Sequence, residues 1–490
     1  MKFSDVPEVL PLLLDKPPAM TFTGIQGDSR RVRPGDVFVA VSGQRDDGAK
    51  YGAAALAKGA VAVVSEAPLR DCAKVNVVVR DARLALAILA NAANGWPSHR
   101  MDVFGITGTN GKTTTAWLLN DLLQAHGRTP GLLTTVQVAY RDRIIPASRT
   151  TPDACELQSL LAAMANAKCD AAVMEVSSHA LDQHRTAGIR FAGAAFTNLS
   201  HDHLDYHRTI EAYWEAKKRL FTQLADGAPG APAACFLDAP YGGQMAAFLA
   251  TLPVRRITCG FSGTADIRAE DVALTPDGSR FTLVSADEAR IPLSVQLAGR
   301  HNIANILCAV ALARSAGVPL ETIATVLAAT RPKWGRLERV PLKAAFRVFV
   351  DYAHTDDALA NVLAAIREMS KGRTIVVFGC GGDRDRAKRP LMGRACAGGA
   401  DVLVVTSDNP RSESPEAIIA EIMVGIPPGT VAHIEPDRRA AIRLALSLAK
   451  ADDVVLVAGK GHESFQEIAG RAFPFDDRRT VMEEGAQLTP

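Results

Sequence analysis

The chain has 490 residues, of which 48% are hydrophobic and 22% are charged, and its formal net charge is +2. This is the composition of an ordinary globular protein, and a charge so close to zero gives no bulk electrostatic reason to expect binding to nucleic acid or to membranes. A chain this long exceeds what one hydrophobic core usually supports, so we expect two to four domains of about 100–200 residues each.

The eight cysteines are scattered through the chain, with no CxxC pair and no spacing typical of a disulfide framework. This usage is typical of reduced thiols in the cytosol. The N-terminus has no positively charged stretch followed by an apolar one, and no uninterrupted apolar run reaches about 18 residues. We therefore expect a cytoplasmic protein that does not insert into membranes.

The first segment, residues 1–97, is predicted to fold as a small α/β domain. Short apolar runs alternate in it with alanine-rich stretches, which predicts strands at 36–41 and 75–79 and helices at 52–60 and 82–94. From this segment alone, the polar stretches 28–31 and 42–48 are interpreted as turns. A Gly-Trp-Pro-Ser sequence at 95–98 marks the expected boundary with the next domain.

The second segment is organised around the motif VFGITGTNGKTTT at residues 103–115. An apolar run breaks there at glycines and passes into an amphipathic run, which is the order strand, loop and helix. Such a loop directs backbone N–H groups, a helix N-terminus and one lysine at a single place, which suits a polyphosphate. On this interpretation Lys112 reaches the β- and γ-phosphates, and Thr113 or Thr114 offers a hydroxyl to Mg²⁺.

The match to the usual phosphate loop is imperfect, and this bears on the class of protein. The pattern GxxxxGK[ST] requires glycine where this chain has Ile106, and the glycines fall instead at 105, 108 and 111. The alternative is a glycine-rich turn with a solvated lysine. The departure argues against a signalling GTPase and for a distinct family of nucleotide-binding proteins.

The rest of the second segment, to about residue 336, is expected to form a parallel sheet with helices on both faces. Apolar runs at 171–176 and 191–198 predict further strands of that sheet. Strands on either side of Pro276-Asp277-Gly278 predict a hairpin, and a helix is expected at 302–316. We interpret the hairpin as a β subsheet within the same domain.

The third segment, residues 337–490, again alternates strand-like and helix-like stretches. Strands are expected at 346–351, 374–378, 402–406 and 454–458, and helices at 355–369, 388–399, 414–424 and 437–450. Ligands of open α/β sheets bind beyond the carboxyl ends of the strands. Polar clusters follow the strands at those ends, in the stretches 351–354, 379–385, 407–411 and 459–463.

Three stretches of the second segment have chemistry that allows two interpretations each. Glu175 ends a predicted strand, where it could hold Mg²⁺ beside phosphates or cap the next helix. Residues 201–207 hold three histidines and two aspartates; without a cysteine or an HExxH motif they predict zinc only weakly, and one imidazole assisting a magnesium ion fits better. The basic residues of a helix at 213–221, Lys217 among them, would ordinarily form a solvated face.

Together these motifs resemble those of the Mur ligases, the ATP-dependent amide-forming enzymes of peptidoglycan precursor synthesis. The matching stretches, in unchanged order, are GTNGKTT at 108–114, MEVSSHALDQHR at 174–185, DHLDYH at 202–207, YWEAK at 213–217, HN at 301–302, GRLE at 335–338 and DYAH at 351–354. The tetrad Asp408-Asn409-Pro410-Arg411 resembles the signature of those enzymes of the MurE branch that add meso-diaminopimelate.

The resemblance implies an α/β fold with the three-domain Mur ligase architecture. It implies a small N-terminal α/β domain that binds the UDP-sugar at 1–97, a central P-loop ATPase-like parallel-sheet domain with a β subsheet at 98–336, and a C-terminal Rossmann-like domain that binds the amino acid at 337–490. In the implied reaction the γ-phosphate of ATP passes to the D-Glu side-chain carboxylate of UDP-N-acetylmuramoyl-L-Ala-D-Glu. Meso-diaminopimelate then attacks the acyl phosphate through a tetrahedral intermediate. The partners are these three substrates, without nucleic acid or membrane, and a monomer is expected.

The resemblance also assigns residues to roles. Catalysis falls to Lys112, Glu175, His203, Lys217 and His354. ATP binding falls to Gly108, Thr109, Asn110, Gly111, Lys112, Thr113, Thr114, Asn302, Arg336 and Asp351, and Mg²⁺ binding to Thr113, Thr114, Glu175, His203 and Lys217. The UDP-muramoyl dipeptide is assigned Ser29, Thr150, Thr151, Ser177, Gln183 and Arg185. Diaminopimelate is assigned Arg384, Asp408, Asn409, Pro410, Arg411, Gly459 and Glu463.

Lys217 matches the family lysine that is carbamylated, which converts a cation into an anion able to support a second magnesium ion; this reverses the interpretation of its helix as a solvated face. Several Mur ligases have histidine after an Asp-Gly pair in the first domain, where this chain has Ala49 after Asp47-Gly48. The departure puts the role of that turn in question and leaves the family resemblance intact.

The diaminopimelate assignment has a basis in charge. This amino acid carries a second amino-carboxylate end, which needs donors for the carboxylate and acceptors for the ammonium. Arg384 and Arg411 supply the donors, and Asp408 and Glu463 the acceptors. A lysine substrate would present only an ammonium to the two arginines, which would repel it.

The sequence leaves three alternatives open. A lysine-adding MurE differs only in the amino acid it accepts. A folylpolyglutamate synthase shares the phosphate loop and the amide-forming reaction but lacks a first domain of this type and the Asp-Asn-Pro-Arg tetrad. An ATP-binding regulatory module would bind nucleotide without ligase turnover, and phosphate release that requires both other substrates would distinguish the ligase from it.

Overall fold

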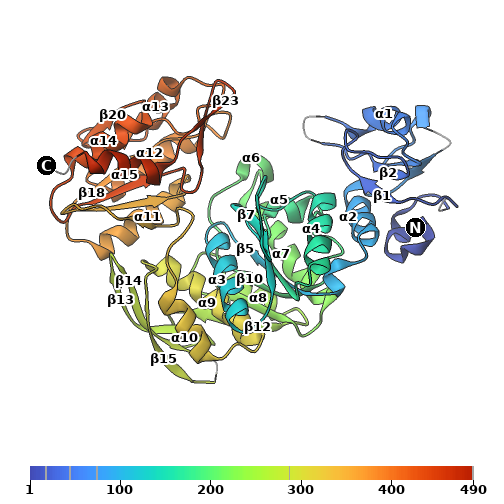
Figure 1. Ribbon diagram of the computed structural model, residues 1–490, viewed down its shortest axis with the longest axis horizontal. Coiled ribbons are helices and arrows are strands. Elements are labelled where there is room, and N and C mark those ends of the chain that lie inside the picture. Colours follow the sequence, from blue (N-terminus) through green and yellow to red (C-terminus); the bar gives the residue numbers. More distant parts are fainter. Residues whose placement is uncertain (17–18, 44–45, 73–74, 286, 488–490) are drawn as a thin grey trace.

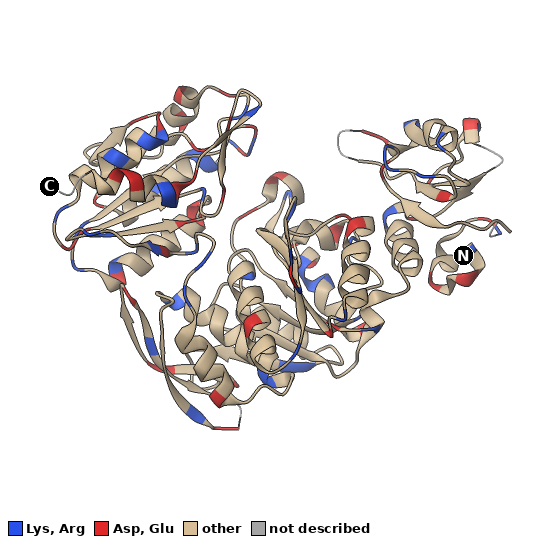
Figure 2. Ribbon diagram, in the orientation of Figure 1, with Lys and Arg blue, Asp and Glu red and all other residues tan. Residues whose placement is uncertain are grey.

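In the computed structural model, residues 1–16, 19–43, 46–72, 75–285 and 287–487 are described. Gln44 and Arg45, which belong to the turn expected at 42–48, lie outside them. The chain forms three successive bodies (Figure 1). Three sheets, of four, eleven and six strands, provide their frameworks. Basic and acidic residues are interspersed over all three bodies, in keeping with the small net charge (Figure 2). None of the described helices is long and apolar enough to cross a membrane.

The first body is a small α/β fold, as predicted, with a parallel sheet in the order β1-β2-β3-β4, of which β1 and β3 were not predicted. Its strands are β1 (Gly24–Gln26), β2 (Asp36–Val39), β3 (Ala62–Ser65) and β4 (Asn76–Val78), and its α-helices are α1 (Gly52–Ala57) and α2 (Ala82–Ala93). Short 3-10 helices lie at Phe3–Asp5, Pro7–Leu12, Gly48–Tyr51 and Arg70–Cys72. Phe22, Val37, Val64 and Leu89 belong to its core. Asp47 caps the third 3-10 helix, because its side chain accepts a hydrogen bond from Ala49 N at 3.0 Å.

The central sheet has the order β15-β14-β13-β12-β11-β10-β5-β9-β6-β7-β8. Its strands are β5 (Asp102–Thr107), β6 (Pro130–Leu133), β7 (Gln137–Tyr140), β8 (Arg143–Pro146), β9 (Ala171–Glu175), β10 (Phe191–Phe196), β11 (Pro232–Phe236), β12 (Arg255–Gly260), β13 (Ile267–Thr275), β14 (Gly278–Val284) and β15 (Arg290–Val295). The strands from β6 to β13 in this order pair in parallel, and the β13–β15 end forms the expected antiparallel subsheet. The antiparallel β7–β8 extension at the other end was not predicted.

Helices cover both faces of the central sheet, as the strand–helix alternation predicts. They are α3 (Lys112–Ala125), α4 (Ala154–Asn166), α5 (Ser178–Asp182), α6 (Leu204–His207), α7 (Ile210–Gly227), α8 (Gly242–Leu249), α9 (Arg300–Ser315) and α10 (Leu320–Ala329), after a 3-10 turn at Pro97–His99. Trp117 and Leu312 lie in the core on one face, and Leu161, Phe221 and Leu249 in the core on the other.

The third body has a six-stranded sheet in the order β16-β17-β21-β18-β19-β20, in which only β16 is antiparallel. The strands are β16 (Glu338–Val340), β17 (Arg347–Asp351), β18 (Thr374–Phe378), β19 (Val402–Val405), β20 (Ala432–Ile434) and β21 (Val454–Ala458), followed by a hairpin of β22 (Phe465–Ile468) and β23 (Arg471–Pro474). Its helices are α11 (Asp356–Met369), α12 (Lys388–Gly399), α13 (Pro415–Met423), α14 (Arg438–Leu448) and α15 (Asp477–Ala486). The first three pack on one face and the last two on the other. The exact domain boundaries, 97/98 and 336/337, stay a prediction.

Candidate active site

The phosphate-loop motif forms the predicted strand, loop and helix. β5 ends at Thr107, and α3 begins at Lys112. Gly111 has φ = +86°, and a Cβ there would lie 2.1 Å from Asn305 Oδ1, so only glycine fits. Lys112 Nζ donates hydrogen bonds to the carbonyls of Gly108 and Thr109, at 2.9 and 2.7 Å. Burial lowers the pKa of Lys112, and the carboxylates of Glu175 and Asp202 oppose that shift. The lysine therefore lies over the loop, facing acidic groups.

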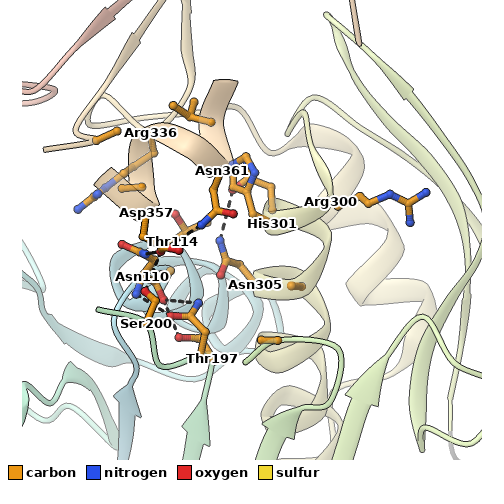
Figure 3. A pocket seen from close by; sticks show the side chains of 18 of the residues that line it. Asn110, Thr114, Thr197, Ser200, Arg300, His301, Asn305, Arg336, Asp357 and Asn361 are labelled. Carbon is orange, nitrogen blue, oxygen red and sulfur yellow. Dashed lines mark hydrogen bonds between the residues drawn. The ribbon is translucent and has the colours of Figure 1, made fainter. Parts of the chain in front are cut away.

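A cavity of about 490 Å³ opens beside this loop (Figure 3). Its volume lies in the range typical of sites for small ligands and cofactors. Of the residues assigned to ATP, those that line it are Asn110, Gly111, Thr113, Thr114, Asn302, Arg336 and Asp351, and His354 joins them. Phe236, Phe261 and His301 add aromatic surface of the kind that can contact a base.

Residues of the third body close this cavity. Asp357 Oδ2, on α11, accepts hydrogen bonds from Asn110 Nδ2 at 2.8 Å and from Ser200 Oγ at 2.7 Å. Figure 3 shows these three side chains converging, whereas Arg300 points away from the group. Arg336 Nη2, in the connection between the two bodies, donates to Thr113 Oγ1 at 3.1 Å. This cavity thus lies between two bodies and takes its wall from both.

Asp351 and His354 lie where β17 ends. Asp351 accepts hydrogen bonds from the backbone N–H groups of Ala353, at 2.7 Å, and Leu337, at 2.5 Å. Burial raises the pKa of Asp351, and the guanidinium of Arg336 opposes the shift. His354 Nδ1 and the carbonyl of Tyr352 are 2.7 Å apart. The carboxyl end of this strand therefore carries the predicted polar cluster.

A second cavity, of about 530 Å³, adjoins the first at the phosphate loop. The two share Asn110, Gly111, Thr113, Arg336, Tyr352 and His354. Glu175 and His203 line the second cavity from the central body, and Arg384, Asp408, Asn409, Arg411, Gly459 and Glu463 line it from the third. Residues assigned to phosphoryl transfer and to the amino acid therefore face one space.

Glu175 does not cap the following helix, which rules out one of its two interpretations. The side chain of Ser177 caps α5, accepting from Ala180 N at 3.2 Å. Glu175 is 1% exposed and accepts hydrogen bonds from the backbone N–H of Thr135 at 2.8 Å and from its hydroxyl at 3.1 Å. The carboxylate is thus held rigidly beside the phosphate loop.

The 201–207 stretch does not form a zinc cage. Among the residues that the structure describes, no three His, Cys, Asp or Glu side chains cluster as metal ligands. His203 Nε2 lies 3.5 Å from Asp202 Oδ2, and burial lowers the pKa of His203 to about 3. Asp202 is also paired with Lys388 of α12, so this stretch joins the central body to the third.

Lys217 is buried rather than part of a solvated face, and it lines neither cavity. It is 1% exposed on α7, and its Nζ lies 4.5 Å from the centre of the Tyr213 ring. Burial lowers the pKa of Lys217 well below its usual value, and the nearby Lys112 lowers it further. Burial therefore shifts the equilibrium of Lys217 toward the neutral amine.

The second-body residues assigned to the dipeptide form one hydrogen-bonded network. Thr151 Oγ1 accepts from Ser177 N at 3.0 Å and donates to the carbonyl of Glu175 at 2.9 Å. Arg185 donates to the carbonyl of Thr151 at 2.8 Å and to Gln183 Oε1 at 2.7 Å. Thr150 lines the second cavity and, through the hydroxyl of Thr135, connects to Glu175.

Ser29 lies apart from this network, in the loop after β1. Its carbonyl accepts a hydrogen bond from Lys58 Nζ at 3.1 Å. The first body meets the central body at Cys155, near the start of α4, which packs against the core of the first body. Ser29 lines neither of the two cavities. The first body therefore approaches the network from the side of α4.

The two arginines assigned to diaminopimelate converge on one glycine. A Cβ on Gly381 would lie 3.0 Å from Arg411 Nη1 and 3.7 Å from Arg384 Cγ. Arg411 also donates to the carbonyl of Gly382 at 2.6 Å, and its Nε lies 3.3 Å from Glu467 Oε2. Pro410 does not line the cavity; its carbonyl accepts from Glu413 N at 3.0 Å and so shapes the turn. Cationic donors therefore cluster at one end of the cavity.

Acceptors lie beside these donors. Asp408 Oδ2 would be 2.5 Å from a Cβ on Gly459, where φ is +114°, so the backbone of this glycine approaches the carboxylate closely. Glu463 Oε2 accepts from Asn409 Nδ2 at 2.8 Å and from Lys460 Nζ at 3.1 Å. The end of the cavity thus presents donors and acceptors side by side.

Sequence reasoning missed Ser200, Asn305, Asp357, Lys388 and Lys460. Asp357 and Lys388 act across the two bodies, and no local pattern marks such contacts. Asn305 follows Asn302 by three residues, which places both on one face of α9; this spacing was a usable signal.

The donors near the phosphate loop fit Mg²⁺, an ion that this fold family implies. Mg²⁺ usually takes one or two protein carboxylates and keeps its other positions for water and phosphate oxygens. Glu175 offers one rigid carboxylate, and Thr113 and Thr114 offer hydroxyls at the start of α3. The small number of protein ligands is therefore what a magnesium–nucleotide complex requires.

Comparison with known proteins gives the class. Family models described as "Mur ligase middle domain", "Mur ligase, glutamate ligase domain" and "Mur ligase family, catalytic domain" match residues 106–313, 335–461 and 21–94. The chain belongs to the Mur ligase family, and it is an ATP-dependent, amide-forming ligase. The predicted family and the predicted three-domain α/β fold class are therefore confirmed.

Two similar proteins of this family carry the name UDP-N-acetylmuramoyl-L-alanyl-D-glutamate--2,6-diaminopimelate ligase. The one from Gloeobacter violaceus is 44% identical, over 95% of this chain and 94% of its own length, and the one from Geobacter sulfurreducens is 42% identical, over 98% of both. A solved structure with this name covers 100% of both chains at 33% identity, with a TM-score of 0.71.

Proposed function

We propose that this enzyme joins meso-diaminopimelate to the D-Glu side-chain carboxylate of UDP-N-acetylmuramoyl-L-Ala-D-Glu, with ATP as the energy source, in peptidoglycan precursor synthesis. One observation carries the proposal. A single cavity is lined both by the phosphate loop and by the cluster of Arg384, Arg411, Asp408 and Glu463. This pairing of donors and acceptors suits the distal amino-carboxylate end of diaminopimelate.

The phosphate loop activates the acceptor carboxylate. A carboxylate does not accept an amine in water until its oxygen becomes a leaving group, which transfer of the γ-phosphate achieves. Two negative reactants must meet for that transfer, so Lys112 lowers the barrier by neutralising charge. Mg²⁺, bound through Glu175 and the hydroxyls of Thr113 or Thr114, supplies further charge neutralisation when present. His203 and His354 face the same cavity, where they position the phosphates by hydrogen bonding.

Lys217 is proposed to act as a carbamate. Burial lowers the pKa of Lys217 and so favours the neutral amine, whose Nζ can attack CO₂, losing a proton to solvent and forming an anionic carbamate. The neighbouring cation of Lys112 stabilises that anion. The carbamate would then assist a second magnesium ion.

The dipeptide substrate is proposed to lie along the network of Thr150, Thr151, Ser177, Gln183 and Arg185. This network is bonded to Glu175, so it would deliver the D-Glu carboxylate to the γ-phosphate. The UDP end would extend toward Ser29 in residues 1–97. Residues 98–336 would bind ATP, residues 337–490 would bind the amino acid, and the enzyme would work as a cytoplasmic monomer.

The test is substrate dependence of phosphate release. The purified enzyme is supplied with ATP and Mg²⁺, and phosphate is measured with the UDP-muramoyl dipeptide, with meso-diaminopimelate, with both and with neither. Release only when both are present, together with a UDP-tripeptide product, supports the proposal. Nucleotide binding without such release would leave a regulatory module, and equal use of L-lysine would leave a lysine-adding ligase.

The same assay with folate substrates tests the remaining alternative, a folylpolyglutamate synthase. A folylpolyglutamate synthase would release phosphate with a folate and glutamate in place of the two cell-wall substrates. The parallel sheet β1–β4 and the Asp408-Asn409-Pro410-Arg411 tetrad favour the cell-wall reaction.

A further inference from the structure

Lys460 is a fully buried lysine next to the proposed amino-acid site, and no role has yet been given to it. Its side chain is 0% exposed. It follows Gly459, which lines the second cavity, and its Nζ lies 5.8 Å from the centre of the Phe465 ring. A buried ammonium is costly unless it is paired, so its partners indicate what it does.

The ammonium has two acceptors, both in the amino-acid site. Lys460 Nζ donates to Asn409 Oδ1 at 2.9 Å and to Glu463 Oε2 at 3.1 Å. Asn409 Oδ1 also accepts from the backbone N–H of Glu467 at 2.9 Å. The Lys460 ammonium and the Glu467 N–H can only donate, so the oxygen of the Asn409 amide must face them. The Asn409 NH₂ is therefore turned toward Glu463, to which it donates at 2.8 Å.

These bonds occupy one oxygen of Glu463 and leave the other. Among the residues that the structure describes, every hydrogen bond to the Glu463 carboxylate is made to Oε2. The side chain is 22% exposed and lines the cavity, so Oε1 is the atom that can accept from a ligand. Two fixed donors on Oε2 hold the carboxylate in one orientation.

We propose that Lys460 is a positioning residue that fixes Glu463 to receive the distal ammonium of the amino-acid substrate, an inference that rests on the proposed function. The lysine touches neither substrate nor nucleotide in this scheme. It fixes the orientation of the Asn409 amide and of the Glu463 carboxylate. Glu463 then selects an amino acid whose far end carries an ammonium beside its carboxylate. Arg384 and Arg411 select the carboxylate independently.

The first experiment compares two amino acids in a Lys460→Met variant, which keeps the chain length and removes the donors. Meso-diaminopimelate has the distal ammonium; L-2-aminopimelate keeps the distal carboxylate and the reacting amine but lacks that ammonium. We expect the KM for diaminopimelate to rise at least about tenfold, with kcat and the KM for ATP changed less than about threefold. The KM for aminopimelate should stay within about twofold of its wild-type value. Lys371→Met, at an exposed lysine of the same body, is the matched control.

The second experiment is a double-mutant cycle with Glu463→Gln. If Lys460 acts through Glu463, adding Lys460→Met to Glu463→Gln should raise the KM for diaminopimelate by less than about twofold more. Three results would overturn the inference. They are a full additional rise in the diaminopimelate KM when Lys460→Met is added to Glu463→Gln, an equal rise in the KM for diaminopimelate and for aminopimelate in Lys460→Met, and an unchanged diaminopimelate KM in Lys460→Met. Lys460→Gln is the second variant; loss of the folded state in both, measured by thermal unfolding, would also overturn it, because the lysine would then be structural. Wild-type enzyme without diaminopimelate-dependent phosphate release would instead refute the proposed function itself.

Discussion

Removing the side chain of Arg411 should weaken diaminopimelate binding and leave ATP binding unchanged. The guanidinium already uses one Nη1 hydrogen on the carbonyl of Gly382 and its Nε on Glu467, which leaves the other Nη hydrogens for a ligand carboxylate. A hydrogen bond between charged groups contributes about 1.5–3 kcal/mol. Glu467 partly neutralises Arg411, and Arg384 remains in the variant. We therefore expect Arg411→Ala to weaken the binding free energy of diaminopimelate by about 2–3 kcal/mol, which raises the KM for diaminopimelate about 30- to 150-fold.

Replacing Arg411 by alanine does not change the strain of the backbone. Arg411 has φ = +54°, a conformation that already carries the strain of a Cβ, and alanine retains that Cβ. Arg394→Ala, at an exposed arginine of α12, is the control for loss of a charge. Steady-state phosphate release would give the KM values for diaminopimelate and ATP, and wild-type enzyme should prefer meso-diaminopimelate over L-lysine by at least about 100-fold in kcat/KM. An unchanged diaminopimelate KM in Arg411→Ala, or equal use of the two amino acids by the wild type, would refute this account of the tetrad.

Three further predictions follow from the central body. Lys112→Ala should lower turnover at least about 1,000-fold while the circular dichroism spectrum stays unchanged, and near-normal activity would contradict the phosphate-loop assignment. Lys217→Ala should lose most activity and regain part of it with added short carboxylates, whereas wild-type behaviour would return this lysine to a purely structural role. Burial lowers the pKa of His207 to about 4, so the unfolded chain takes up this proton first as the pH falls below about 6.5. The unfolding temperature should therefore fall between about pH 6.5 and pH 4, and an equally steep fall in His207→Gln would contradict that cause.

The elements that sequence reasoning predicted are those whose pattern is local. Apolar runs became β9 and β21, and the glycine-rich stretch became the loop between β5 and α3. The β7–β8 hairpin escaped prediction because β8 is exposed along its whole length, so burial imposes no apolar pattern on it. Local patterns thus account for most of the fold and for the place of each polar cluster.

The candidate site was predicted less completely, because part of it depends on contacts between distant residues. Lys217 has the sequence of a solvated helix face, and only the packing of α7 against the sheet buries it. Asp357 meets Asn110 although 247 positions separate them, and Lys388 meets Asp202 across 186. Contacts between residues so far apart in the chain produce no recognisable spacing in the sequence. The resemblance to the Mur ligases supplied the roles of residues whose local pattern gave none.

The shared wall of the nucleotide cavity has a consequence for how the protein unfolds. Asn110 lies in the loop that leads into α3, whose side chains belong to one hydrophobic core, whereas Asp357 lies on α11, which packs in another, so each core could in principle unfold by itself. A ligand that binds only when both walls are in place stabilises that joined form by RT ln(1 + [L]/Kd), about 2.7 kcal/mol at a hundred times Kd. If the two cores unfold separately without ligand, we expect saturating ATP to couple them, so that calorimetry shows one unfolding transition in place of two.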